Sequence, residues 1–95
     1  MKNQLLPVGS VVSLENAEKK LVIIGAGVKR ENDEKLYDYI GVPFPEGYVD
    51  SDTMFLFMAK DIEKVHFMGY INSEVQVFKM QYAKYLEDNN LFNEE

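Results

Sequence analysis

The sequence contains no cysteine and no tryptophan, and its single histidine is His66. Without cysteine the chain has no disulfide bond, no thiol nucleophile and no cysteine-ligated zinc site. One histidine is too few for any site in which two imidazoles of the same chain bind a metal. We therefore expect no metal and no cofactor.

Basic residues are also in short supply. Ten Lys and Arg stand against 16 Asp and Glu, which gives a net charge of −6. The basic residues are scattered and mostly sit beside acids, as in residues 29–35. Nucleic acids and anionic membrane surfaces need clustered positive charge. The composition therefore excludes nucleic acid as a partner and argues against binding to an anionic membrane.

Long hydrophobic runs are missing as well. No run approaches the roughly 20 apolar residues that cross a membrane. The apolar stretch near the N-terminus is broken by Pro7 and Gly9, so it cannot serve as the apolar region of a signal peptide. We expect no membrane insertion and a cytoplasmic location.

What remains is the composition of a small folded domain. Leu, Ile, Val and Phe make up roughly 31% of the 95 residues, above the level of below about 20% that is typical of disordered chains. This length suits one domain, residues 1–95, with a small core and marginal stability.

Five short antiparallel strands are predicted within residues 9–70, because β-branched and aromatic residues recur between turn signals. The second strand is expected to continue beyond a bulge at Gly25-Ala26-Gly27 as far as Val28. One helical turn is expected at 59–63. The predicted strands are 9–14, 20–24 with its continuation, 36–42, 53–57 and 62–69.

One helix is predicted over residues 73–88. Ser73 and Gln76 have the spacing of a capping box, and apolar residues then recur at helical intervals at Val75, Phe78, Tyr82 and Tyr85. Residues 89–95 are expected to form a flexible acidic tail. The fold class is therefore α+β: a small five-stranded antiparallel curled sheet or SH3-like barrel, with the C-terminal helix packed on it.

Three motifs that suggest chemistry have structural explanations. Gly25-Ala26-Gly27 lacks the third glycine of a dinucleotide-binding loop, whose position holds Arg30. Asp50-Ser51-Asp52 lacks the later ligands of a calcium loop and is typical of a turn. His66 is interpreted as a half-exposed histidine of a strand. We therefore predict no catalytic, cofactor-binding or metal-binding residue, and no enzyme.

Partner-binding candidates come from two segments. The 43–48 loop presents Phe44 and Tyr48, which either anchor a protein interface or fold back as a lid on the core. The helix supplies the other three candidates, Val77, Met80 and Tyr85. These three residues either meet a partner helix, including a second copy in a homodimer, or are consumed by the sheet.

Four sequence segments, taken in order, are distinctive as a set. They are LLPVGSVV at 5–12, KLVIIG at 20–25, YDYIGV at 37–42 followed by FPEGY at 44–48, and Asp61, Ile62, Val65, Phe67, Gly69 and Tyr70. Over about residues 5–85 the chain resembles a domain-of-unknown-function family of small Firmicutes (Gram-positive) proteins. Its members are typically encoded in type VII secretion gene clusters near toxins with an LXG targeting domain.

The resemblance implies a cytoplasmic accessory protein, a chaperone or targeting factor for a secreted LXG-type effector. It transfers no catalytic residue. The alternatives are an immunity protein that neutralises a cognate toxin domain and a homodimeric scaffold of the same gene cluster.

Overall fold

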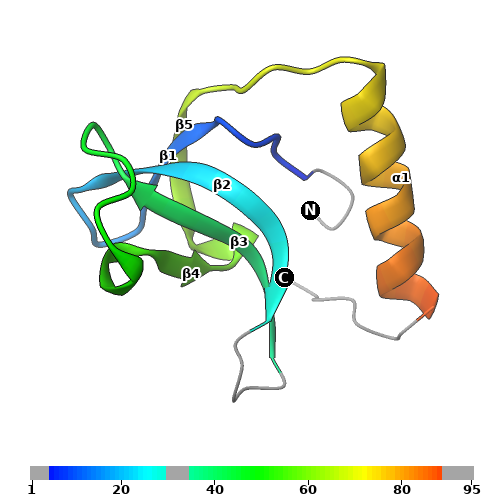
Figure 1. Cartoon of the computed structure of the whole chain (residues 1–95), viewed down its shortest axis with the longest axis horizontal. Coiled ribbons are helices and arrows are strands. Elements are labelled where there is room, and N and C mark those ends of the chain that lie inside the picture. The colour runs from blue at the N-terminus through cyan, green and yellow to red at the C-terminus, as the bar shows by residue number, and fades with distance from the viewer. Residues whose placement is uncertain (1–4, 30–34, 89–95) are drawn as a thin grey trace.

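A computed structural model of the chain describes residues 5–29 and 35–88 (Figure 1). Residues 30–34 and the predicted acidic tail at 89–95 lie outside the described residues. Within them the structure contains five strands, one α-helix and two single 3-10 turns. They are β1 (Val11–Leu14), β2 (Lys20–Lys29), β3 (Leu36–Pro43), η1 (Ser51–Thr53), β4 (Phe55–Phe57), η2 (Ala59–Asp61), β5 (Ile62–Phe67) and α1 (Ser73–Asp88).

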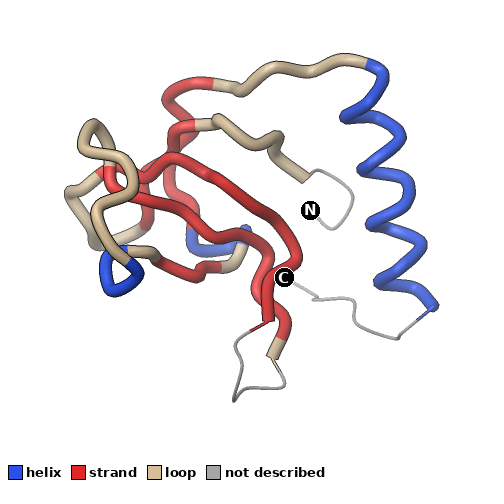
Figure 2. Tube along the Cα trace, in the orientation of Figure 1, coloured by secondary structure: helices blue, strands red, loops and turns tan. Residues whose placement is uncertain are grey.

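The strands form one antiparallel sheet in the order β4-β3-β2-β1-β5. The first four strands follow one another as a meander, and β5 returns to pair with β1. Figure 2 shows the sheet curling upon itself, with α1 to one side of it. The predicted class, a curled antiparallel sheet of SH3-like type with one C-terminal helix, is confirmed.

A bulge interrupts β2, but it lies at Ile24, one residue before the predicted Gly25-Ala26-Gly27. The pairing of β2 with β3 shifts register between Ile23 and Gly25, and the strand then continues to Lys29. Gly27, just past the shift, has a positive φ of 64°, which a residue with a Cβ adopts only at a cost. The bulge lets a ten-residue strand bend around the core.

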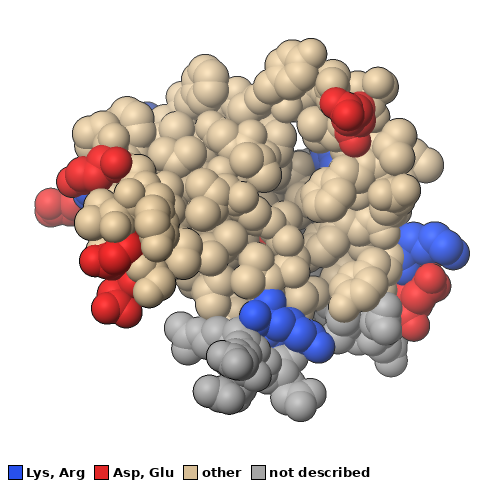
Figure 3. Space-filling model, in the orientation of Figure 1, with Lys and Arg blue, Asp and Glu red and all other residues tan. Residues whose placement is uncertain are grey.

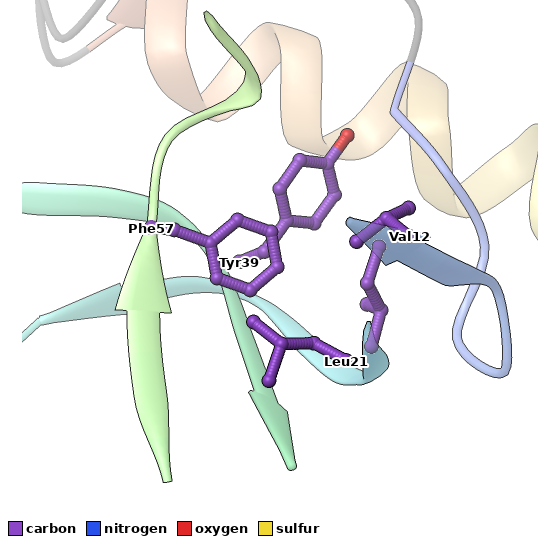
Figure 4. Packing of buried hydrophobic residues seen from close by; sticks show 5 residues of the cluster. Val12, Leu21, Tyr39 and Phe57 are labelled. Carbon is purple, nitrogen blue, oxygen red and sulfur yellow. The ribbon is translucent and has the colours of Figure 1, made fainter. Parts of the chain in front are cut away.

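The core lies inside the curl. Val12, Ile23 and Tyr39 are at most 1% exposed, and Leu21 and Phe57 are nearly as buried. Figure 4 shows the rings of Tyr39 and Phe57 side by side, with Val12 and Leu21 beside them; the two ring centroids are 5.6 Å apart. β-branched and aromatic side chains therefore fill the interior.

The helix has the predicted bounds, Ser73–Asp88, but the predicted cap is wrong. Asn72, and not Ser73, caps α1, because the Asn72 Oδ1 accepts the Val75 N–H at 3.2 Å. The fourth strand begins at Phe55 because Thr53 belongs to η1, where its hydroxyl donates to the Asp50 carbonyl at 2.8 Å. At both places a side chain close in sequence forms the local hydrogen bond, which sets the cap of α1 and the start of β4. The first strand begins at Val11 and the fifth ends at Phe67, so both are shorter than predicted.

Candidate protein-binding surfaces

The 43–48 loop holds its two aromatic side chains in solvent. Phe44 is 42% exposed and Tyr48 is 64% exposed. Of the two arrangements that the sequence left open, the structure therefore has the rings outward and not as a lid on the core. Exposed aromatic rings commonly become buried in a protein interface.

The loop backbone is held at both ends. The Phe44 N–H donates to the Lys20 carbonyl at 2.9 Å, and the Gly47 N–H donates to the Pro43 carbonyl at 2.7 Å. The Lys19 ammonium lies 2.8 Å from the Glu46 carboxylate. The hydrogen bond from Lys19 holds the pKa of Glu46 below its usual value. The loop is therefore already ordered before any partner arrives.

Acidic side chains surround this loop. Glu46 belongs to the loop itself, Asp50 and Asp52 belong to η1 and its cap, and Glu15 and Glu18 belong to the turn between β1 and β2. All five side chains are exposed. In Figure 3 acidic side chains gather at the left end of the molecule, where Figure 1 places this loop and this turn. Together with Phe44 and Tyr48, these acids form what we call the acidic aromatic surface.

The helix candidates lie elsewhere. Val77 is 51% exposed, Met80 is 71% exposed and Tyr85 is 46% exposed. α1 and the 43–48 loop lie at opposite ends of the molecule in Figure 1. The structure therefore does not bring the two sets of predicted partner-binding residues together, and each would have to act as its own surface.

A groove that the sequence reasoning missed lies between α1 and the sheet. Its volume is about 560 Å³, and Figure 3 shows the hollow between the sheet and the helix. The walls come from the N-terminal segment, the β2 bulge, the connection after β5 and the N-terminal half of α1. The large apolar and aromatic residues that line it are Leu5, Leu6, Val8, Tyr70, Val75 and Phe78. The apolar stripe that begins at Val75 did not reveal the groove, because a stripe does not show which of its residues the sheet covers.

The histidine has a hydroxyl partner across two strands. His66 on β5 is exposed, and its Nε2 lies 3.1 Å from the Ser13 Oγ on β1. A nucleophilic serine needs its imidazole oriented by a third group and a nearby site for substrate. The groove described above does not include this pair, so the geometry here is that of a cross-strand hydrogen bond.

Among residues 5–29 and 35–88, no three His, Cys, Asp or Glu side chains are grouped as metal ligands. Nor does any helix of that part have the length and apolar character to cross a membrane.

Comparison with known proteins gives one match. A family model described as a domain of unknown function, DUF4176, matches residues 5–78. The match begins where the resemblance noted in the sequence begins, and it ends within α1, at Phe78. No curated protein and no solved structure matches the chain significantly.

Proposed function

We propose, given that the chain belongs to the DUF4176 family of domains of unknown function, that the protein is a non-enzymatic module that binds a basic protein partner. The observation that carries this proposal is the acidic aromatic surface, on which Phe44 and Tyr48 are exposed beside five acidic side chains.

The chemistry of this surface favours positive charge. Aromatic faces attract Lys and Arg side chains, and exposed carboxylates pair with them. The net charge of −6 adds long-range attraction, which speeds association with a basic partner at low salt. Because the loop is already ordered, binding costs little conformational entropy there.

The resemblance suggests who the partner is. In a type VII secretion cluster it would be an LXG-type effector, held in the cytoplasm by this protein acting as a chaperone or targeting factor before export. The family match supports membership of a domain-of-unknown-function family; the secretion role is our proposal.

The test is co-expression with each toxin encoded beside the gene, with purification through a tag on one component. We expect retention of the effector, and an association rate that falls as ionic strength rises. The double variant Phe44→Ala with Tyr48→Ala should lose at least about tenfold in affinity. Phe67→Ala, an exposed aromatic on β5, is the matched control and should bind within about twofold of the parent.

The following outcomes distinguish a chaperone from an immunity protein and from a homodimeric scaffold. Failure of every toxin in the cluster to bind overturns the proposal, as does unchanged affinity of the double variant. Binding that follows the C-terminal toxin half of a truncated effector, together with rescue of growth, shows an immunity protein in place of a chaperone. Light scattering of the pure protein tests the homodimeric scaffold.

A further inference from the structure

The groove beneath α1 exists because the helix packs on the sheet through its C-terminal half. Tyr82 lies against Gly27 of β2, and Leu86 is buried. In the N-terminal half, Val75, Phe78 and Lys79 line the groove, and Phe78 remains 47% exposed. The inner face of this half of the helix is therefore apolar and uncovered.

The opposite wall is held in place by hydrogen bonds. The Leu6 N–H donates to the hydroxyl of core residue Tyr39 at 3.0 Å. The Gly69 N–H donates to the buried Ser10 hydroxyl at 3.0 Å, which fixes the start of the connection to α1. Because both walls are tied to the sheet, the groove is preformed, and its volume of about 560 Å³ falls in the range of ligand pockets, about 300–1,000 Å³.

The charges along the groove indicate what it accepts. Two charged residues line it, Glu74 and Lys79. The Glu74 carboxylate accepts from the Asn72 amide at 3.3 Å. Lys79 is half-buried, and residues 5–29 and 35–88 supply it with no ion pair. A half-buried ammonium beside apolar walls is complementary to a carboxylate that enters with an apolar group.

We propose that this groove binds a short apolar segment of another protein that carries an acidic side chain, with Lys79 pairing with its carboxylate. The site is distinct from the acidic aromatic surface, which favours a basic partner, and it does not depend on the proposed role in secretion. It also places the binding face of α1 inside, at Val75 and Phe78, and not at the outward Val77 and Met80.

The structure supports a second copy of the chain less well than an apolar, acidic segment as the partner of α1. Outside the groove, α1 offers Val77, Met80 and Tyr85 as exposed large apolar side chains, next to the Lys84–Asp88 ion pair. Three side chains bury far less than the roughly 800 Å² per partner of a stable interface.

The test compares two pairs of variants on one helix. Val75→Glu puts a charge into the groove, whereas Val77→Glu puts the same charge on the outward face; both suit the helix N-terminus, where negative charge is tolerated. Lys79→Met removes the ammonium and keeps the apolar stem. Lys84→Met makes the same change at an exposed position and is its control.

The probe is a phage-displayed library of 16-residue peptides, selected on the parent protein and measured individually by calorimetry. We expect enriched peptides that combine bulky apolar residues with Asp or Glu. Val75→Glu should weaken them at least tenfold, and Val77→Glu and Lys84→Met should leave them within twofold. Lys79→Met should weaken them about fivefold, and this loss should vanish for peptides whose acid is changed to its amide.

Several results would overturn the inference. They are the absence of any enriched peptide sensitive to Val75→Glu, enrichment of basic in place of acidic residues, and equal binding to Lys79→Met and the parent. Native mass spectrometry of the purified protein tests for a further contradicting result. A small molecule that is bound to the parent and absent from Val75→Glu would make the groove a small-ligand site. If the neighbouring effector binds yet ignores Val75→Glu, the proposed function stands and only its use of this groove fails.

Discussion

The ring of Tyr82 on α1 lies against Gly27 of β2, so closely that a Cβ at position 27 would stand 2.6 Å from the tyrosine Cε1. Phe78, one turn earlier, stacks on the same ring with centroids 6.2 Å apart. The contact between Tyr82 and Gly27 attaches the C-terminal half of the helix to the sheet. The N-terminal half of the helix is left over the groove.

Gly27→Ala should therefore weaken the attachment of α1. Gly27 has φ 64° and Gly47 has φ 79°, but no atom lies within 4 Å of a Cβ at Gly47. Gly47→Ala should cost only the left-handed backbone penalty, about 1–2 kcal/mol. Gly27→Ala should cost at least about 1 kcal/mol more, since the Tyr82 ring must also move. Urea denaturation measures the free energy of unfolding of the two variants. Equal losses in both would contradict a stabilising contact between Tyr82 and Gly27.

Tyr82 makes stability depend on pH at the alkaline end. Its hydroxyl is buried, with no hydrogen-bond partner in the described part of the chain, and burial is the main cause that raises its pKa from 10.0 to about 12. The unfolded chain loses this proton first, so the stabilisation present below pH 10 is lost as pH rises from about 10 to 12. The parent should lose more stability over this range than Tyr82→Phe.

Tyr82→Phe is informative at neutral pH as well. Because it removes a buried hydroxyl that has no partner, it should leave the free energy of unfolding unchanged or raise it by up to about 1 kcal/mol. If the stability of the parent and of the variant falls in parallel as pH rises, the pKa of the Tyr82 hydroxyl is not raised by folding. Ultraviolet titration gives an independent check, since one of the six tyrosines should ionise near pH 12.

Ser10→Ala should loosen the connection between β5 and α1. Ser10 is fully buried, and its Oγ accepts the Gly69 N–H. Without it this buried N–H is left unpaired, at a cost of about 1–3 kcal/mol. Ser13→Ala removes the hydroxyl that meets exposed His66 and should change stability by less than about 0.5 kcal/mol. Hydrogen exchange at Gly69 should rise only in Ser10→Ala, and protection there in both variants would contradict the assignment.

Much of the fold could be predicted because it depends on neighbours in sequence. Strand alternation, the glycines that follow the bulge in β2 and the apolar spacing of α1 are local patterns, and each predicted its element within a few residues. The cap at Asn72 was missed because Asn and Ser, adjacent in sequence, are both good caps, and only the folded backbone decides which one meets Val75. Among the candidate residues, exposure of Phe44 and Tyr48 was left open because loop side chains have no periodicity to reveal their direction.

Composition and local pattern thus determined an acidic, cysteine-free chain with five strands and one helix. They could not determine which face of that helix stays uncovered. That choice depends on contacts between distant segments, such as Tyr82 on Gly27 and the Ser10–Gly69 hydrogen bond across 59 positions. Such contacts form only when the sheet has curled, so the groove and its half-buried Lys79 belong to the tertiary structure alone.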